Sequence, residues 1–452
     1  MEQTILKIST IILCVLGIIY ICRKKSKIEI FIDFRFWLLF SWIICIGLNL
    51  FSGINYSILL TLKSFLYIIA VLAIFIIGTL FSQEFLIDKI NNYLKKKKSN
   101  VKKSFSQKLN MFPSFVFSTV CMIIYVIYMF SVNDIVFGVT RDINANWIST
   151  LFLIGTSLSL VVWLYELCYA ILNNKMITWY GIISLIIFNV PGLIISGRDA
   201  LIISLLATFI TFLIAGYYMK RVLKKPTYIY NKIKKLSIFF CIIVLFYLVF
   251  LSSNRYGNSI DSALKIFEWS SQCTFPDYLK FIYYNLGGIG QVIINAIYYY
   301  SSQLSKFSLI FEEYNGPYLF GFYQLHYVSR LLPESWGLNY TLVSESIREI
   351  TTNANIPGLR VFWETAIGYS IYDFGRIGTI IMSFFGGIIV GTINGLCQKN
   401  PRIITLILQA FICVGMFLTV ELSPLFDYFY IFPFFWILVI FGFERFKNKA
   451  KK

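Results

Sequence analysis

The sequence predicts an all-α, polytopic membrane protein with about 11 transmembrane helices (N-terminus outside, C-terminus inside) and one large external loop that contains interfacial helices. Only 14% of the residues are charged and 58% are hydrophobic, whereas a soluble domain is about one quarter charged. Apolar runs of about 20 residues recur along the chain, the length that crosses a ~30 Å hydrocarbon layer. These runs must be helical, because lipid offers no partner to a free backbone polar group.

We expect eleven spans, placed along the chain in the following order. They cover 4–22, 33–52, 58–81, 112–131, 148–172, 177–195, 200–219, 236–252, 377–397, 403–420 and 427–443. The first run is followed by the basic sequence RKKSK, which is the reverse of the order in a secretory signal peptide. We therefore expect an uncleaved first span with its N-terminus outside.

Charge patterning sets the expected orientation. With this map, most lysines and arginines fall in the loops and tail on one side, and most acidic residues fall in the loops on the other side. Basic loops face the cytoplasm, so the acidic loops are external. The same sorting explains the net charge of +18 through topology and anionic lipid headgroups, and we expect no nucleic-acid partner.

Three regions follow from the loop lengths. Residues 1–252 form an N-terminal transmembrane bundle of about eight spans, 253–376 form a large external loop region, and 377–452 form a C-terminal bundle of about three spans with a basic tail. Long loops inside compact proteins are usually functional. Within this loop, Leu286–Ile310 is apolar but contains Gly, Gln, Asn and Ser, and we expect an interfacial or re-entrant helix there.

Motifs for soluble cofactors are missing. The chain contains one histidine, and its nine cysteines form no CxxC pattern or Cys/His cluster, so the sequence gives no zinc site and no disulfide framework. It also has no P-loop, no GxGxxG motif before a helix and no DxD-type acidic pair. We expect no cofactor and no metal, and we do not expect ATP, dinucleotides or nucleotide sugars as substrates.

The first candidate site is the sequence SGRDA at Ser196–Ala200, between two predicted spans. Arg198 would lie where a helix begins, beside free backbone N–H groups. Helix N-termini attract anions, and arginine binds phosphate oxygens bidentately. The alternative is that Arg198 and Asp199 simply pair at the membrane interface.

The second candidate site is a charge cluster ahead of an apolar run. Arg360, Glu364, Asp373 and Arg376 fall within 17 residues of each other, and charges at a membrane helix are costly unless functional. If Arg360–Ser370 is helical, Arg360 and Glu364 share a face at i, i+4. One reading is an ordinary salt bridge. The other is a phosphate clamp beside a carboxylate that serves as a base.

The third candidate site is the middle of the loop, where His326 and Arg330 are four residues apart. A lone histidine among aromatic residues is usually structural, although its charge change near neutral pH suits a proton acceptor. Arg255 is a weaker phosphate candidate just after the eighth predicted span. The dense aromatic residues of the loop fit membrane-interface belts first, with sugar stacking as a second use.

Two of these motifs carry a resemblance. SGRDALI at a span boundary, the large late external loop and the sequence YDFGRIGTIIMSFFGGIIVG together resemble the Wzy-type O-antigen or oligosaccharide repeat-unit polymerases. Some members carry an arginine followed by ten residues and a glycine. Arg376 and Gly387 match that spacing, whereas Phe209 stands at the matching place after Arg198.

The resemblance implies a metal-independent glycosyltransferase in the bacterial cytoplasmic membrane, with its active site facing outside. The donor would be a glycan on undecaprenyl diphosphate and the acceptor a lipid-linked repeat unit, with membrane lipid, a chain-length regulator and a flippase as further partners. A related ligase, which uses another acceptor, and a non-enzymatic flippase are the alternatives. The predicted diphosphate-binding residues are Arg198, Arg360, Arg376, Arg330 and Arg255, and the predicted catalytic residues are Glu364, Asp373 and His326.

Overall fold

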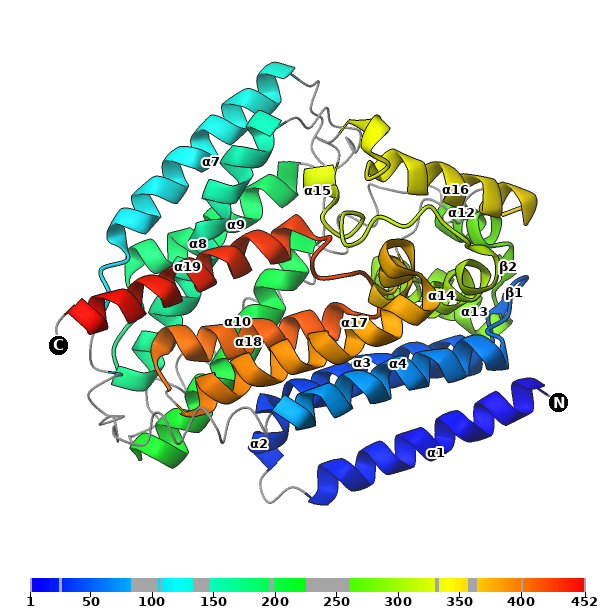
Figure 1. Ribbon diagram of the computed structural model, residues 1–452, viewed down its shortest axis with the longest axis horizontal. Helices are drawn as coiled ribbons and strands as arrows, with labels where there is room; N and C mark the ends of the chain where they lie inside the picture. The colour runs from blue at the N-terminus through cyan, green and yellow to red at the C-terminus, as the bar shows by residue number, and fades with distance from the viewer. Residues whose placement is uncertain are drawn as a thin grey trace.

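A computed structural model of the chain shows an assembly of helices (Figure 1). The residues that the structure describes are 2–23, 27–82, 105, 108–132, 147–194, 199–224, 261–329, 333–356, 364–399 and 401–450.

Six of the described helices are long and apolar enough to cross a membrane. They are α3 (Phe34–Phe51), α4 (Leu62–Phe81), α7 (Phe112–Val132), α8 (Trp147–Asn173), α10 (Asp199–Tyr217) and α17 (Ala366–Lys399). Shorter apolar helices are α9 (Trp179–Ile194), α18 (Ile403–Leu418) and α19 (Tyr428–Ala450), and the chain begins with α1 (Glu2–Arg23) and α2 (Lys27–Ile32). A short π-helix, η2 (Tyr218–Leu223), continues α10.

The all-α membrane class is confirmed, and each predicted span within the described residues coincides with a helix. The predicted span 236–252 lies outside the described residues, and the count of eleven spans and the orientation stay predictions. The expected boundary between the external loop region and the final bundle stays a prediction, and α17 has a kink at Gly375, directly beside it. α17 begins at Ala366, and its non-helical residue Gly375 separates the part that contains Asp373 from the part that begins at Arg376.

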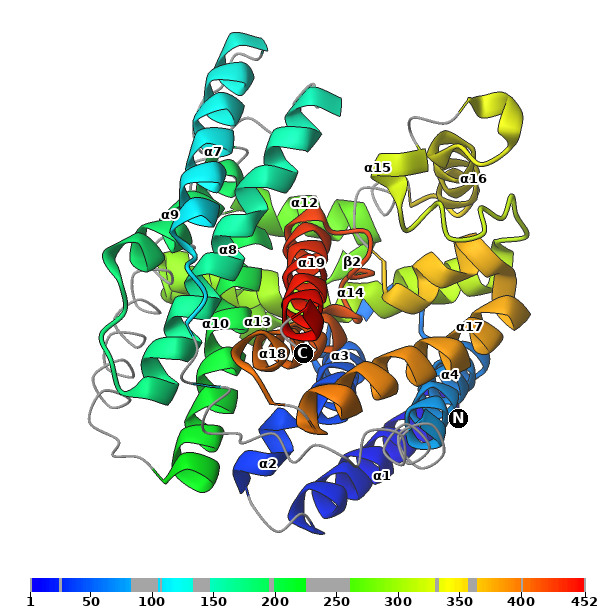
Figure 2. The same ribbon diagram turned by 60° about the vertical axis from the view of Figure 1, so that its left-hand side comes forward.

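The centre of the bundle is α18, which is buried on nearly all sides. Its residues from Ile403 to Gly415 are all buried, as expected for a helix that is apolar all round. Figure 2 shows it between α3, α10 and α19, which it contacts. α8 is the second buried helix, and it joins α18 to α7 and α9.

Helices α4 and α17 pack closely through glycines. A Cβ atom at Gly387 would lie 2.1 Å from the Phe75 carbonyl oxygen, and one at Gly78 would lie 2.3 Å from the Phe384 carbonyl oxygen. Small residues let two membrane helices approach until their backbones touch. Gly387, the glycine of the Arg-ten-Gly spacing, therefore has a packing role in this fold.

The predicted external loop contains most of the remaining helices. They are α12 (Asp261–Ser271), α13 (Asp277–Asn285), α14 (Gly287–Glu313), α15 (His326–Ser329), a 3-10 helix η3 (Glu334–Trp336) and α16 (Tyr340–Asn353). β1 (Asn55–Tyr56), in the connection between α3 and α4, pairs antiparallel with β2 (Cys273–Thr274), with Asn55 opposite Thr274. Figure 1 shows most of these elements gathered at the end of the molecule away from the C-terminus, with α15 nearer the centre.

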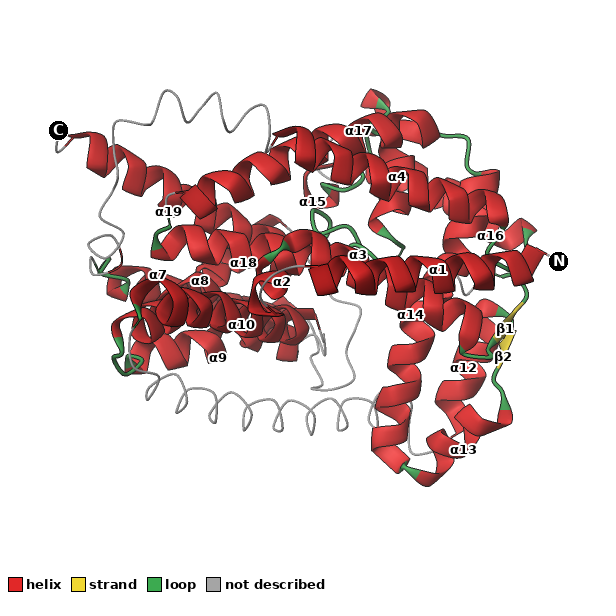
Figure 3. Cartoon of the chain, turned by 90° about the horizontal axis from the view of Figure 1, so that it is seen from below, coloured by secondary structure: helices red, strands yellow, loops and turns green. Residues whose placement is uncertain are grey.

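Helix α14 is more internal than the sequence suggested. Ser301–Ser308 are all buried, with at most 3% exposure, although an interfacial helix keeps one face open to headgroups and water. Figure 3 shows α14 running from beside α3 into the lobe that α12 and α13 form. Only the first half, with Ile289 and Ile293, has exposed large apolar side chains. The second half is therefore an internal helix, which allows it to carry a buried charge.

Candidate functional site

A buried ion pair joins α14 to the start of α17. The Nζ atom of Lys306 lies 3.0 Å from Oε1 of Glu364, and the two side chains are 2% and 5% exposed. Burying both charges costs several kcal/mol per ion in desolvation, so such a pair is a weak source of stability. The other carboxylate oxygen, Oε2, is buried and has no hydrogen-bond partner among the described residues.

Aromatic side chains surround this pair. The rings of Tyr323 and Tyr372 are 4.8 Å apart, and those of Tyr314 and Tyr372 are 4.7 Å apart. Burial, with the Glu364 charge as a smaller cause, raises the pKa of Tyr323 and Tyr314 above the ordinary value. These hydroxyls therefore stay protonated near neutral pH and can act as hydrogen-bond donors beside the carboxylate.

His326 lies in the same cluster, stacked on a phenyl ring. Its ring centroid is 4.0 Å from that of Phe426, which in turn lies 4.7 Å from Tyr369. His326 is 9% exposed. The structure thus brings His326, Glu364 and Asp373 around one aromatic cluster, although His326 comes from α15 and the two acids come from the segment at the start of α17.

Asp373 holds the loop that follows α14. Its two carboxylate oxygens accept hydrogen bonds from the backbone N–H groups of Tyr323 (2.8 Å) and Gln324 (3.2 Å), and its carbonyl accepts one from Phe320 (2.9 Å). This carboxylate is fully enclosed. Its geometry is that of a capping residue that fixes a turn.

Arg376 binds the C-terminal end of α14. Its guanidinium donates to the carbonyl oxygens of Phe311 (2.7 Å) and Glu312 (3.0 Å) and lies 5.4 Å from the centre of the Phe311 ring. A cation is favourable at a helix C-terminus, where the carbonyl groups have no helical partner. The adjacent Gly375 adopts φ 67° and ψ 179°, a conformation that is almost limited to glycine, and it breaks α17 at this point.

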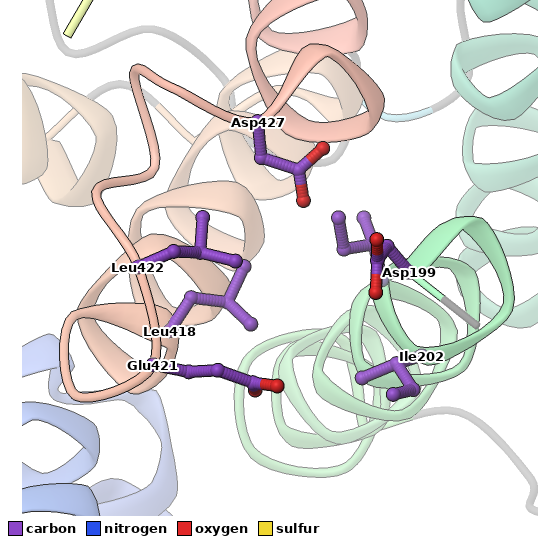
Figure 4. Close-up of a pocket in the computed structure, with 7 residues that line it drawn as sticks. Asp199, Ile202, Leu418, Glu421, Leu422 and Asp427 are labelled. Atoms are coloured by element: carbon purple, nitrogen blue, oxygen red, sulfur yellow. The ribbon is translucent and has the colours of Figure 1, made fainter. Parts of the chain in front are cut away.

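A second polar site lies where α10 begins. Asp199, Glu421 and Asp427 line one pocket, and their carboxylates point into it (Figure 4). Oδ1 of Asp427 accepts from the Phe429 N–H group (2.8 Å), which caps α19. The connection between α18 and α19 also reaches the aromatic cluster, because the Ser423 hydroxyl donates to Oε1 of Gln324 (2.5 Å).

Of the five predicted arginines, the structure describes Arg376 alone. Arg198, Arg255, Arg330 and Arg360 lie outside the described residues. The condition under which Arg360 and Glu364 would share a helix face is not met at Glu364, because Glu364 and Thr365 are not helical and α17 starts at Ala366. The partner that the structure gives to Glu364 is Lys306 on α14. Asp199, next to Arg198, begins α10 as expected.

Lys306, Glu421 and Asp427 were missed by reasoning from the sequence. A signal for each was present: Lys306 is the single charge in 286–310, and Glu421 and Asp427 are the only acidic residues between 403 and 443. An isolated charge in an apolar run usually has a buried partner or a function. Comparison with known proteins finds no family model, curated protein or solved structure that matches this chain.

Proposed function

We propose that this protein is a membrane glycosyltransferase that extends a glycan on undecaprenyl diphosphate at the outer face of the bacterial cytoplasmic membrane. One observation carries the proposal: Glu364 is buried and held by Lys306 through one oxygen, while its other oxygen has no partner among the described residues. The resemblance of Tyr372–Gly391 to the repeat-unit polymerases supports the same class of reaction.

The reaction needs a proton acceptor and a stabilised leaving group. A hydroxyl group of the acceptor sugar attacks the anomeric carbon of the donor and gives its proton to Oε2 of Glu364. The bond between the anomeric carbon and the diphosphate oxygen breaks, and undecaprenyl diphosphate leaves with the electron pair. Base catalysis of this type contributes about 10²–10⁴ in rate, and fixed positive charge stabilises the leaving diphosphate.

Glu364 is favoured as the base over the two other predicted residues. Both carboxylate oxygens of Asp373 accept backbone hydrogen bonds, and the ring of His326 stacks on Phe426. Lys306 contacts Oε1 of Glu364, which leaves Oε2, without a partner among the described residues, as the oxygen that can accept the proton.

The five predicted arginines have two proposed roles, diphosphate binding and the positioning of α14. We assign diphosphate binding to Arg198, Arg255, Arg330 and Arg360, since a guanidinium keeps its charge and fits phosphate oxygens. Arg376 donates to the end of α14, so we assign it a positioning role for the helix that carries Lys306. For Arg376 to bind diphosphate as predicted, its guanidinium would have to break its hydrogen bonds to the carbonyl oxygens of Phe311 and Glu312.

Purified protein incubated with undecaprenyl-diphosphate repeat units tests the proposal. We expect a ladder of longer glycans without ATP, and a loss of about 10²–10⁴ in rate for Glu364→Gln. Glu349→Gln on α16, where the side chain is exposed, is the matched control and should extend glycans normally. Unchanged substrate would exclude the polymerase, transfer to a different acceptor only would indicate the ligase, and movement across liposomes without extension would indicate a flippase.

A further inference from the structure

One face of α14 carries buried polar side chains that lead to the Lys306–Glu364 pair. Gln291, Asn295, Ser302 and Lys306 are separated by four, seven and four residues, and these steps keep side chains on one side of an α-helix. Gln291 is 7% exposed, and the other three are at most 2% exposed. The stripe therefore runs inside the protein over sixteen residues, whose fifteen helical steps span about 22 Å.

The neutral members of this stripe have unsatisfied polar atoms. Oε1 of Gln291, both amide atoms of Asn295 and Oγ of Ser302 are buried without a hydrogen-bond partner among the described residues. Each such atom costs about 1–3 kcal/mol when it stays unpaired. Native proteins usually meet this cost with ordered internal water, which makes about three hydrogen bonds per molecule.

We propose that the stripe from Gln291 to Lys306 holds a chain of ordered water molecules that connects Glu364 to the surface of the lobe formed by α12 and α13. The amides and the hydroxyl can each donate and accept hydrogen bonds, as the members of a water chain require.

The water chain gives the reaction a route for its proton, and this part of the inference rests on the proposed function. After the acceptor hydroxyl transfers its proton to Glu364, that proton must leave before the next cycle. Release of that proton restores the contact between the Lys306 ammonium and the Glu364 carboxylate that the structure shows at 3.0 Å. The proton passes from Oε2 of Glu364 along the waters to bulk solvent, and Glu364 returns to the carboxylate form.

X-ray radiolytic labelling of the full-length protein tests the hydration without any activity measurement. Internal ordered water produces hydroxyl radicals beside buried side chains, so we expect labels within 291–306 despite their burial. Asn295→Leu should reduce this labelling. A dry stripe, with no labels above those of the buried α18 segment 403–415, would overturn the proposal even if the protein is an active polymerase.

Kinetics test the proton route separately. We expect Asn295→Leu and Ser302→Ala to slow glycan extension by about tenfold or more, to raise the solvent deuterium isotope effect and to be rescued by small diffusible buffers. Thr211→Val removes a buried hydroxyl on α10 that also has no partner among the described residues, and it should change none of these. The proton route would be overturned if the wild-type stripe is labelled but Asn295→Leu and Ser302→Ala extend glycans at the normal rate. If the wild type extends no glycan, the proposed function fails. The labelling experiment then still shows whether the stripe holds water.

Discussion

The Lys306 ammonium and the Glu364 carboxylate lie 3.0 Å apart inside the protein, on segments 58 residues apart in the chain. Their contact ties α14 to the segment just before α17, and both residues lie in the predicted external loop region. A buried pair of this kind is rarely kept for stability alone, because apolar residues of similar size often serve as well. The relationship therefore makes separable predictions about folding and about catalysis.

Lys306→Met should destabilise the protein by about 3–5 kcal/mol, because it leaves the Glu364 charge buried without its partner. The double variant Lys306→Met/Glu364→Gln should regain most of this loss, since no buried charge remains. Thermal unfolding in detergent measures both effects. If the pair also serves catalysis, the double variant folds well but does not extend glycans.

Lys280 provides the matched control for that prediction. It forms an ion pair with Glu268 at 3.6 Å, but these side chains are 39% and 31% exposed. Lys280→Met should therefore change stability by only about 0–1 kcal/mol. A similar loss of stability in both lysine variants would show that the burial of Lys306 does not increase the cost of removing its charge.

Gly387→Ala should destabilise the packing of α4 against α17, whereas Gly386→Ala should not. The added Cβ at Gly387 meets the Phe75 carbonyl oxygen at 2.1 Å, but at Gly386 the nearest atom is a Phe75 ring carbon at 3.7 Å. Overpacking of this kind costs about 1–3 kcal/mol. Equal melting temperatures for the two variants would contradict the close contact of these helices.

The membrane fold could be predicted from the sequence because span length and charge sorting are local properties. The α14 helix could be predicted as well, but not its burial, since its contacts come from α3, α13 and α17. The partner of Glu364 was missed for a similar reason. Helical spacing proposes neighbours four residues away, whereas Lys306 reaches Glu364 only through tertiary packing.

Gly375→Ala should destabilise the break in α17. The residue adopts φ 67° and ψ 179°, and a side chain there costs about 1–3 kcal/mol. The new Cβ would also lie 3.3 Å from the Tyr318 ring. Gly47→Ala in α3, where nothing lies within 4 Å of the added atom, is the control and should leave the melting temperature nearly unchanged.

The tyrosines near Glu364 should make the fold sensitive to alkali. Burial raises the pKa of Tyr323 and Tyr314 in the folded state, whereas an unfolded tyrosine titrates near pH 10. Below that pH both states are protonated and stability is unaffected. Above it only the unfolded state ionises, so stability falls as the pH rises. Absorbance at about 295 nm follows the ionisation, and Tyr323→Phe should remove one late-titrating group; early titration of all tyrosines would contradict their burial.

Asp373→Asn distinguishes a residue that fixes a loop from one that takes the proton. The carboxylate accepts hydrogen bonds from the N–H groups of Tyr323 and Gln324, and hydrogen bonds to a charged group are worth about 1.5–3 kcal/mol. The amide keeps one acceptor oxygen, so we expect a lower melting temperature with glycan extension reduced less than in Glu364→Gln. Comparing the two variants at a temperature where both are folded separates the roles. A Glu364→Gln variant that retains activity, beside an inactive and fully folded Asp373→Asn variant, would move the base to Asp373 and overturn the assignment made from geometry.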